Sequence, residues 1–74
     1  MNEEIINIIA SVAEVPSKKI NLDTNLVKDL ELGSLDLVTL VSEFEEKYNI
    51  TVEDKDIKNL QTVKDIVDYI SKNV

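Results

Sequence analysis

Ser34 is the residue whose type and position in this sequence best suit chemistry. It follows Gly33, the only glycine, and precedes Leu35 and Asp36 at the predicted start of a helix. The first turn of a helix presents unpaired backbone N–H groups and a partial positive charge, so a phosphate attached there would be stabilised. A serine in this position is also an ordinary N-cap that needs no further function. The sequence around Ser34 is compatible both with a phosphate attachment site and with an ordinary N-cap.

The absence of histidine and cysteine limits what Ser34 can do. Neither a Ser-His-Asp triad nor a Cys-His pair can form, so any base that activates the hydroxyl must come from another protein. A structural zinc site is excluded for the same reason. The acids Glu53, Asp54 and Asp56 lack the central glycine of an EF-hand loop, so no dedicated calcium site is expected either.

Acidic residues are concentrated in the middle of the chain. The 74 residues hold 15 acids and 8 basic residues, all of them lysine, for a net charge of −7. From Asp29 to Asp56 nine acids face two lysines, so this segment carries the whole −7. Nucleic acid is excluded, because phosphate recognition needs clustered Lys and Arg. A run of acidic residues is usually just the solvent-exposed face of a helix. Here the acidic charge is confined to one segment of the chain, which favours a docking face for a basic protein.

The spacing of apolar residues predicts an all-α fold, a small four-helix bundle with three longer helices and one short one. Asn2, Ser34 and Thr62 are expected to cap the longer helices, and Asn49 to end the second. The connection before Ser34 is long but rich in apolar residues, so we expect an ordered crossover with one helical turn near 26–30. The helices are expected at about 3–14, 34–48, 53–58 and from 63 onward.

The predicted second helix has one apolar stripe and two apolar residues outside it. At about 100° per residue, Leu37, Leu40, Val41, Phe44 and Tyr48 share the face expected to be buried. Leu35 and Val38 lie on the other side, together with Glu45 and Glu46. The sequence therefore predicts two exposed apolar side chains, rimmed by acids, directly after Ser34.

The run from Asp29 to Asp36, DLELGSLD, resembles the attachment motif of the acyl carrier proteins, Asp-Leu-Gly-x-Asp-Ser-Leu-Asp. The stretches 25–30, 44–50 and 60–70 resemble the approach to that site, the acidic end of the recognition helix and the last helix. Gly33 departs from the family, which usually has aspartate there. Thr39 and Ser42 replace an acid and an apolar residue of the best-known bacterial fatty-acid carriers. Because of these departures, the protein could serve a specialised pathway and not bulk fatty-acid synthesis.

The resemblance implies a carrier that is not an enzyme. A separate phosphopantetheinyl transferase would attach 4'-phosphopantetheine from coenzyme A to Ser34, and the thiol of the arm would carry acyl groups as thioesters. The protein would deliver them to synthases, reductases and acyltransferases of fatty-acid or related polyketide and specialised lipid biosynthesis. Basic patches on these enzymes would dock on residues that match family positions: Leu35, Asp36, Val38, Glu45 and Glu46.

Two other functions remain open from the sequence. A peptidyl or D-alanyl carrier shares the arm but not the cargo, and an acidic interaction module would have no prosthetic group. We expect residues 1–74 to form a single acyl-carrier domain that is monomeric and cytoplasmic. No signal peptide, membrane span or metal site is expected.

Overall fold

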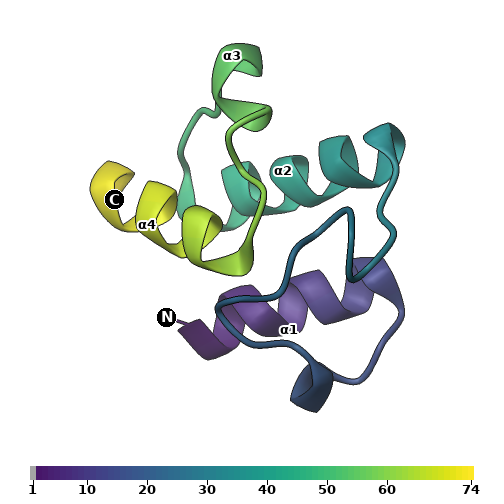
Figure 1. Cartoon of the computed structure of the whole chain (residues 1–74). Helices are drawn as coiled ribbons and strands as arrows, with labels where there is room; N and C mark the ends of the chain where they lie inside the picture. The colour runs from purple at the N-terminus through teal and green to yellow at the C-terminus, as the bar shows by residue number, and fades with distance from the viewer. Residues whose placement is uncertain (1) are drawn as a thin grey trace.

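The computed structural model describes residues 2–74, which form four α-helices and one short 3-10 helix (Figure 1). This confirms the predicted all-α class with three longer helices and a short one. The described residues contain no strand, only an isolated bridge between Asn25 and Thr62. The elements are α1 (Asn2–Ala13), η1 (Ser17–Lys19), α2 (Ser34–Tyr48), α3 (Asp54–Ile57) and α4 (Val63–Asn73).

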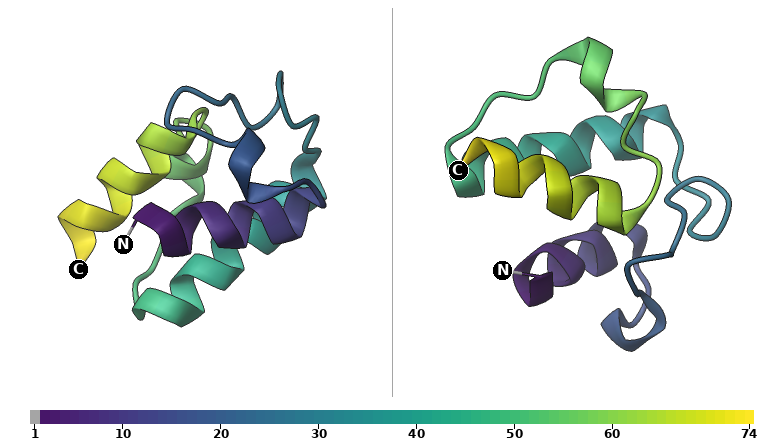
Figure 2. Two further views of the ribbon diagram at one scale, coloured as in Figure 1. Left: turned by 90° about the horizontal axis from the view of Figure 1, so that it is seen from below. Right: turned by 60° about the vertical axis from the view of Figure 1, so that its left-hand side comes forward.

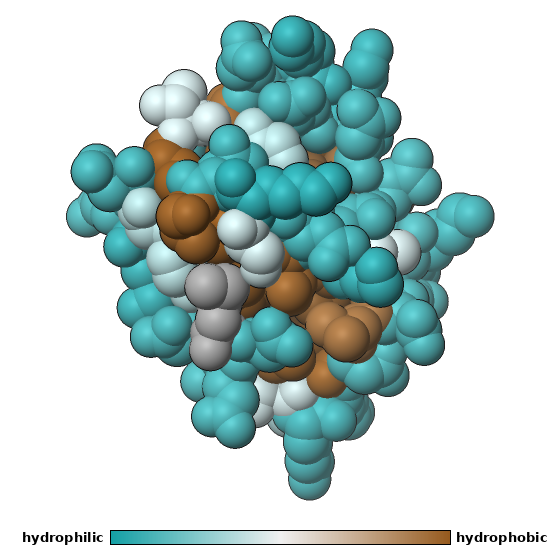
Figure 3. Space-filling model, turned by 90° about the vertical axis from the view of Figure 1, so that its left-hand side faces the viewer, coloured by the Kyte–Doolittle hydropathy of each residue, from teal (hydrophilic) through white to brown (hydrophobic). Residues whose placement is uncertain are grey.

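The short helix α3 and the long helix α1 lie on opposite sides of α2 and α4, as Figure 1 and the right-hand view of Figure 2 show. The start of α1 and the end of α4 lie at one end of the molecule, and the start of α2 lies at the other (Figure 1). The end that carries the termini is mostly hydrophilic, with one band of apolar side chains across it (Figure 3). No helix in the described part is both long and apolar enough to cross a membrane.

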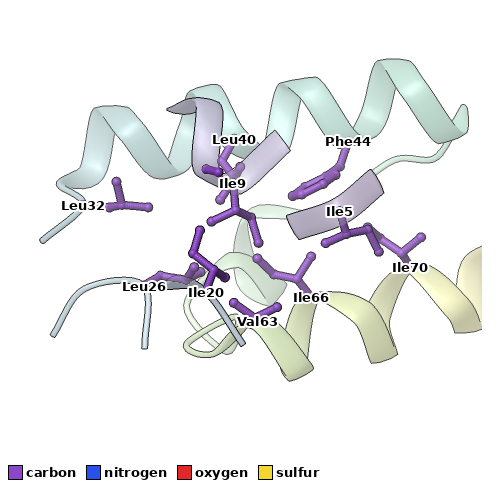
Figure 4. Packing of buried hydrophobic residues seen from close by; sticks show 11 residues of the cluster. Ile5, Ile9, Ile20, Leu26, Leu32, Leu40, Phe44, Val63, Ile66 and Ile70 are labelled. Atoms are coloured by element: carbon purple, nitrogen blue, oxygen red, sulfur yellow. The ribbon is translucent and has the colours of Figure 1, made fainter. Parts of the chain in front are cut away.

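The buried core is built by the three long helices and the crossover together (Figure 4). Branched residues on one face of each helix meet at the centre, where burying each such side chain stabilises the fold by about 1.5–3 kcal/mol. The crossover adds Ile20, Leu26 and Leu32, all at most 6% exposed. The helices contribute Ile5, Ile9 and Ala10 from α1, Leu40 and Phe44 from α2, and Val63, Ile66 and Ile70 from α4.

The long crossover is ordered, as predicted, because its backbone pairs with the start of α4. Leu26 N donates to Gln61 O at 2.8 Å, and Val63 N donates to Thr24 O at 3.0 Å. The turn expected near 26–30 is present, but two of its N–H groups donate to the same carbonyl oxygen. The N–H groups of Asp29 and Leu30 both donate to Asn25 O, at 2.9 and 3.2 Å. The segment is therefore a hydrogen-bonded turn and not a helix.

Of the four residues predicted to cap or end a helix, Thr62 and Asn49 are confirmed, whereas Asn2 and Ser34 are each the first residue of a helix. Thr62 caps α4, since its Oγ1 accepts from Asp65 N at 3.2 Å. Asn49 ends α2 in the left-handed conformation, with φ 54°, which asparagine tolerates better than most residues. Asn2 is the first residue of α1 and so does not precede it as a cap. The cap position before it lies outside the described residues.

Candidate functional site

Ser34 is the first residue of α2, and Gly33 is its N-cap. The prediction that Ser34 itself caps the helix is therefore wrong. The reason is the carboxylate of Asp36, which accepts a hydrogen bond from Gly33 N at 3.1 Å and so fixes the start of the helix one residue earlier. Ser34 is exposed. Its hydroxyl is not used as a cap, so it is available for modification.

The first turn of α2 fits an attached phosphate. Glycine has no side chain, so no N-cap oxygen competes for the N–H groups of Leu35 and Asp36. These groups and the partial positive charge of the helix start favour an anion at this point. The Asp36 carboxylate is turned toward Gly33 N. A phosphodiester on Ser34 would thus meet unpaired donors of the helix.

Two apolar side chains stand beside Ser34 on the outer face of α2, as the helical spacing predicts. Leu35 is 83% exposed and Val38 is 55% exposed. The opposite face carries the core residues Leu40 and Phe44, at 1% and 3% exposed. Leaving a whole leucine in water forgoes its burial energy, so this pair marks a surface that another molecule can cover.

Of the three acids predicted for docking, Glu45 and Glu46 differ in their surroundings. Glu46 is exposed, whereas Glu45 is half-buried. The Glu45 carboxylate accepts from Val52 N at 2.9 Å. It thereby holds the loop that follows α2, a structural contact that the sequence analysis missed. Glu45 and Val52 are seven positions apart, and α2 ends between them at Asn49. The spacing of residues along a helix therefore could not predict this contact.

A small apolar cavity lies between α2, α3 and α4, with a volume of about 20 Å³. Phe44, Ile66 and Ile70 are among the residues that line it. One side of the cavity is closed by α3, and a side-chain hydrogen bond joins that helix to α4. Tyr69 Oη donates to Asp56 Oδ2 at 2.9 Å. Burial, and then the bond to the Asp56 carboxylate, raises the pKa of the Tyr69 hydroxyl, so it stays protonated and remains a donor.

No three acidic side chains of residues 2–74 converge in an arrangement that could hold a metal ion. The acids of α2 are spread along the helix. Asp36, at the start, is turned back to Gly33, and Glu45, near the end, is bound to Val52.

Comparisons with known proteins agree with this arrangement. The family model for the phosphopantetheine attachment site matches residues 3–70. An acyl carrier protein of Syntrophobacter fumaroxidans is 41% identical over 73 residues, which are 99% of this chain and 90% of that protein. One from Aster yellows witches'-broom phytoplasma is 42% identical over 71 residues, 96% of this chain and 93% of that protein.

A solved structure shares the whole architecture. It is assigned as an acyl carrier protein from Mycobacterium tuberculosis, and it superposes with a TM-score of 0.88 at 28% identity, covering 96% of this chain and 95% of that one. Family, relatives and fold agree over nearly the full length. The chain belongs to the phosphopantetheine-binding acyl carrier protein family, which carries acyl groups on covalent 4'-phosphopantetheine for fatty-acid biosynthesis and is not itself an enzyme.

Proposed function

We propose that Ser34 is the residue to which 4'-phosphopantetheine is attached. The observation that carries this proposal is the exposed Ser34 hydroxyl on the first residue of α2, with free backbone donors beside it. The chain has no histidine, so the base belongs to the transferase. That base takes the Ser34 proton, and Ser34 Oγ bonds to the pyrophosphate phosphorus of coenzyme A that carries pantetheine. The bond from this phosphorus to the bridging oxygen breaks, and adenosine 3',5'-bisphosphate leaves. Once attached, the arm supplies the thiol that holds acyl groups as thioesters.

The docking surface that we propose surrounds this serine. Leu35 and Val38 form its apolar centre, and Asp36 and Glu46 supply negative charge at its rim. Glu45 adds charge to the rim while it holds the loop after α2. Complementary charge accelerates encounter and orients a partner more than it adds affinity, which suits a carrier that must leave again. The partners are a phosphopantetheinyl transferase and acyl synthases, reductases and acyltransferases with basic patches.

The cellular setting that we propose follows from these partners. Residues 1–74 act as a single acyl-carrier domain, monomeric and cytoplasmic, with no cysteine to be oxidised. The cargo is acyl, for fatty-acid synthesis or a related specialised lipid or polyketide pathway. Gly33, Thr39 and Ser42 support the specialised alternative, since they alter the surface that a transferase or synthase meets.

Mass spectrometry after incubation with coenzyme A, magnesium and a broad-specificity phosphopantetheinyl transferase tests the attachment. The wild-type protein should gain one phosphopantetheine, and Ser34→Ala should gain none while keeping its helical circular dichroism spectrum. Ser42→Ala is the matched control, because Ser42 is an exposed serine of the same helix. It should load like the wild type. Modification that persists in Ser34→Ala would overturn the assignment.

A further inference from the structure

Glu31 lies three residues before Ser34 and has a left-handed backbone conformation, with φ 55°. The next residue, Leu32, donates its N–H to Leu26 O at 3.1 Å, and its side chain is only 6% exposed. The positive φ thus belongs to the turn that returns Leu32 to the core. Glycine adopts this conformation without a steric penalty, whereas a residue with a Cβ pays a cost in free energy. The backbone therefore does not favour glutamate at position 31.

The side chain of Glu31 is not used within the fold, unlike those of its acidic neighbours. Asp29 Oδ2 accepts from Asn25 N at 2.7 Å, and Asp36 Oδ2 accepts from Gly33 N at 3.1 Å. Glu31 is exposed, and its carboxylate has no hydrogen bond or ion pair in the part of the chain that the structure describes. Of these three acids, Glu31 alone has a carboxylate that is free for another molecule.

The position of Glu31, and not its conformation alone, points to a function. Glu14 is also left-handed, with φ 58°, but it directly follows α1, where such a residue commonly ends a helix. Glu31 is tied to the attachment site by the chain itself. Three residues of fully extended chain span at most about 11 Å, so its Cα lies within that distance of the Cα of Ser34.

The enzyme that modifies Ser34 also meets residue 31. A specific interface buries about 800 Å² on each partner, a patch roughly 30 Å across. A patch of that size centred on Ser34 extends beyond Glu31. Enzymes that act later react with the thioester at the far end of the arm, so their active sites need not reach the serine. Among the expected partners, the transferase is therefore the one that Glu31 is best placed to contact.

We propose that Glu31 is a recognition residue for the phosphopantetheinyl transferase, and that a basic side chain of that enzyme pairs with its carboxylate as Ser34 enters the active site. The inference rests on the proposed attachment at Ser34, and it adds a docking residue outside α2. Gly33 leaves the position before the serine uncharged. Glu31 supplies the free acid on the crossover side of the site, where opposite charge orients the enzyme and accelerates encounter.

Loading kinetics with coenzyme A and a broad-specificity phosphopantetheinyl transferase test this proposal. Mass spectrometry of peptides first verifies that Ser34 is the residue modified. At low salt, Glu31→Gln should lower kcat/KM for loading by about threefold, as expected for the loss of one exposed ion pair. The change should lie mainly in KM, and high salt should remove it. Glu31→Asp keeps the charge and should load nearly like the wild type.

Glu31→Gly distinguishes recognition from an effect on the fold. It relieves the left-handed strain, so it should melt no lower than the wild type, yet it should load as slowly as Glu31→Gln. The charge control is Glu3→Gln, which removes one exposed acid from the start of α1, at the opposite end of the molecule from the start of α2 (Figure 1). It should load like the wild type.

A second readout separates the transferase from the enzymes that act later. Once loaded, Glu31→Gln should accept an acyl group from an acyltransferase at the wild-type rate. Val38→Ala, which alters the apolar centre of the docking surface on α2, should slow both loading and acylation. This split between the two steps is not expected of a residue that affects only the stability of the protein.

Each contrary result identifies what is wrong. Loading at a residue other than Ser34 would overturn the attachment and the recognition by Glu31 together. Loading at Ser34 with equal rates for Glu31→Gln and the wild type at low salt would overturn only the recognition. Slow loading that persists at high salt, or that Glu31→Asp shares, would show that the charge is not what the transferase reads. Equal slowing by Glu3→Gln would assign the effect to net charge, and equal slowing of acylation would show that Glu31 is not specific to the transferase; either result overturns the proposal.

Discussion

At the residue scale, Gly33 and not Ser34 occupies the N-cap position of α2. Gly33 has φ −88° and ψ −178°, an extended conformation that any residue adopts. A Cβ on Gly33 would meet only the Asp36 carboxylate, at 3.9 Å. Glycine is therefore not required here by the backbone, and its effect is to leave the N-cap without a side chain.

The variant Gly33→Asp should fold normally and load faster with a generic bacterial transferase. Aspartate is a better N-cap than glycine by a few tenths of a kcal/mol, and repulsion from Asp36 offsets part of that gain. The added charge also faces the basic surface of the transferase, so the gain in loading rate should be largest at low ionic strength. Loading rates at two salt concentrations and melting temperatures measure both effects.

Gly33→Asn is the control for this prediction, since asparagine caps a helix about as well without the charge. It should be at least as stable as Gly33→Asp, because it lacks the repulsion from Asp36, but it should load no faster than the wild type. Equal loading rates for the glycine and aspartate proteins at low salt would show that the missing carboxylate does not matter to this partner. A markedly lower melting temperature would show a backbone requirement that the geometry of Gly33 does not reveal.

Variants of Glu45 and Glu46 should distinguish an effect on stability from an effect on docking. Glu45→Ala removes the acceptor of Val52 N and should lower the free energy of unfolding by about 1 kcal/mol. Glu46→Ala should change it by less than about 0.5 kcal/mol, because Glu46 is exposed. Both changes should slow partner association at low salt. Urea unfolding and association kinetics distinguish them, and equal stability of the two variants would contradict the structural function of Glu45.

At the element scale, the start of α4 is fixed by a reciprocal cap. The Asp65 carboxylate accepts from the N–H groups of Gln61 and Thr62, both at 3.0 Å, while Thr62 Oγ1 accepts from Asp65 N. These backbone donors, the N–H of Thr62 above all, lower the pKa of Asp65. The same segment pairs with the crossover through Leu26 N and Gln61 O, so this cap secures two parts of the fold.

The cap of α4 should make stability depend on pH. Because the Asp65 pKa is lower in the folded protein than in the unfolded chain, its contribution is complete above the unfolded pKa of about 4. It is lost as the pH falls through the folded value. Asp65→Asn should therefore be less stable than wild type at pH 7 and should lose less stability between about pH 5 and pH 3. Urea unfolding across this range measures the difference.

Asp23→Asn is the matched control, because Asp23 is an exposed aspartate of the crossover. It should follow the wild-type pH profile closely. If Asp65→Asn and the wild type lose equal stability on acidification, the carboxylate of the cap does not contribute to acid sensitivity. In that case the decline comes from the other acids of the chain.

At the scale of the whole molecule, the net charge of −7 is held in a body with a radius of gyration of only 10.9 Å. The screening length is about 8–10 Å at physiological salt, so acids within that distance of one another repel, and at about 0.01 M salt the repulsion extends across the molecule. The described chain has three ion pairs, and all of them involve partly exposed side chains. Such pairs offset little of the repulsion.

The melting temperature should therefore rise with sodium chloride. It should rise more steeply with low millimolar magnesium, because a divalent ion screens clustered acids better. The measurement is thermal unfolding at constant pH over a series of each salt. Glu43→Gln/Glu46→Gln, which removes two exposed charges of α2, should reduce the salt dependence. A melting temperature that is flat in both salts would remove self-repulsion as a determinant of stability.

The sequence alone determined the features that depend on neighbours along the chain. Apolar residues at helical spacing predicted the long helices, and Thr62 with Asp65 predicted the start of α4. The same spacing predicted that Leu35 and Val38 would be exposed beside Ser34. These features are local, since the faces of a helix follow from its period of 3.6 residues and its ends from side chains within one turn.

Only the tertiary structure decided the features that join distant parts of the chain. The small apolar cavity is lined by residues as far apart in the chain as Leu26, Phe44 and Ile70. Glu45 reaches Val52 across the reversed end of α2, and the crossover becomes ordered by pairing with the start of α4. No local period encodes such contacts, because they form when burial of the shared core fixes the helices and the crossover against one another.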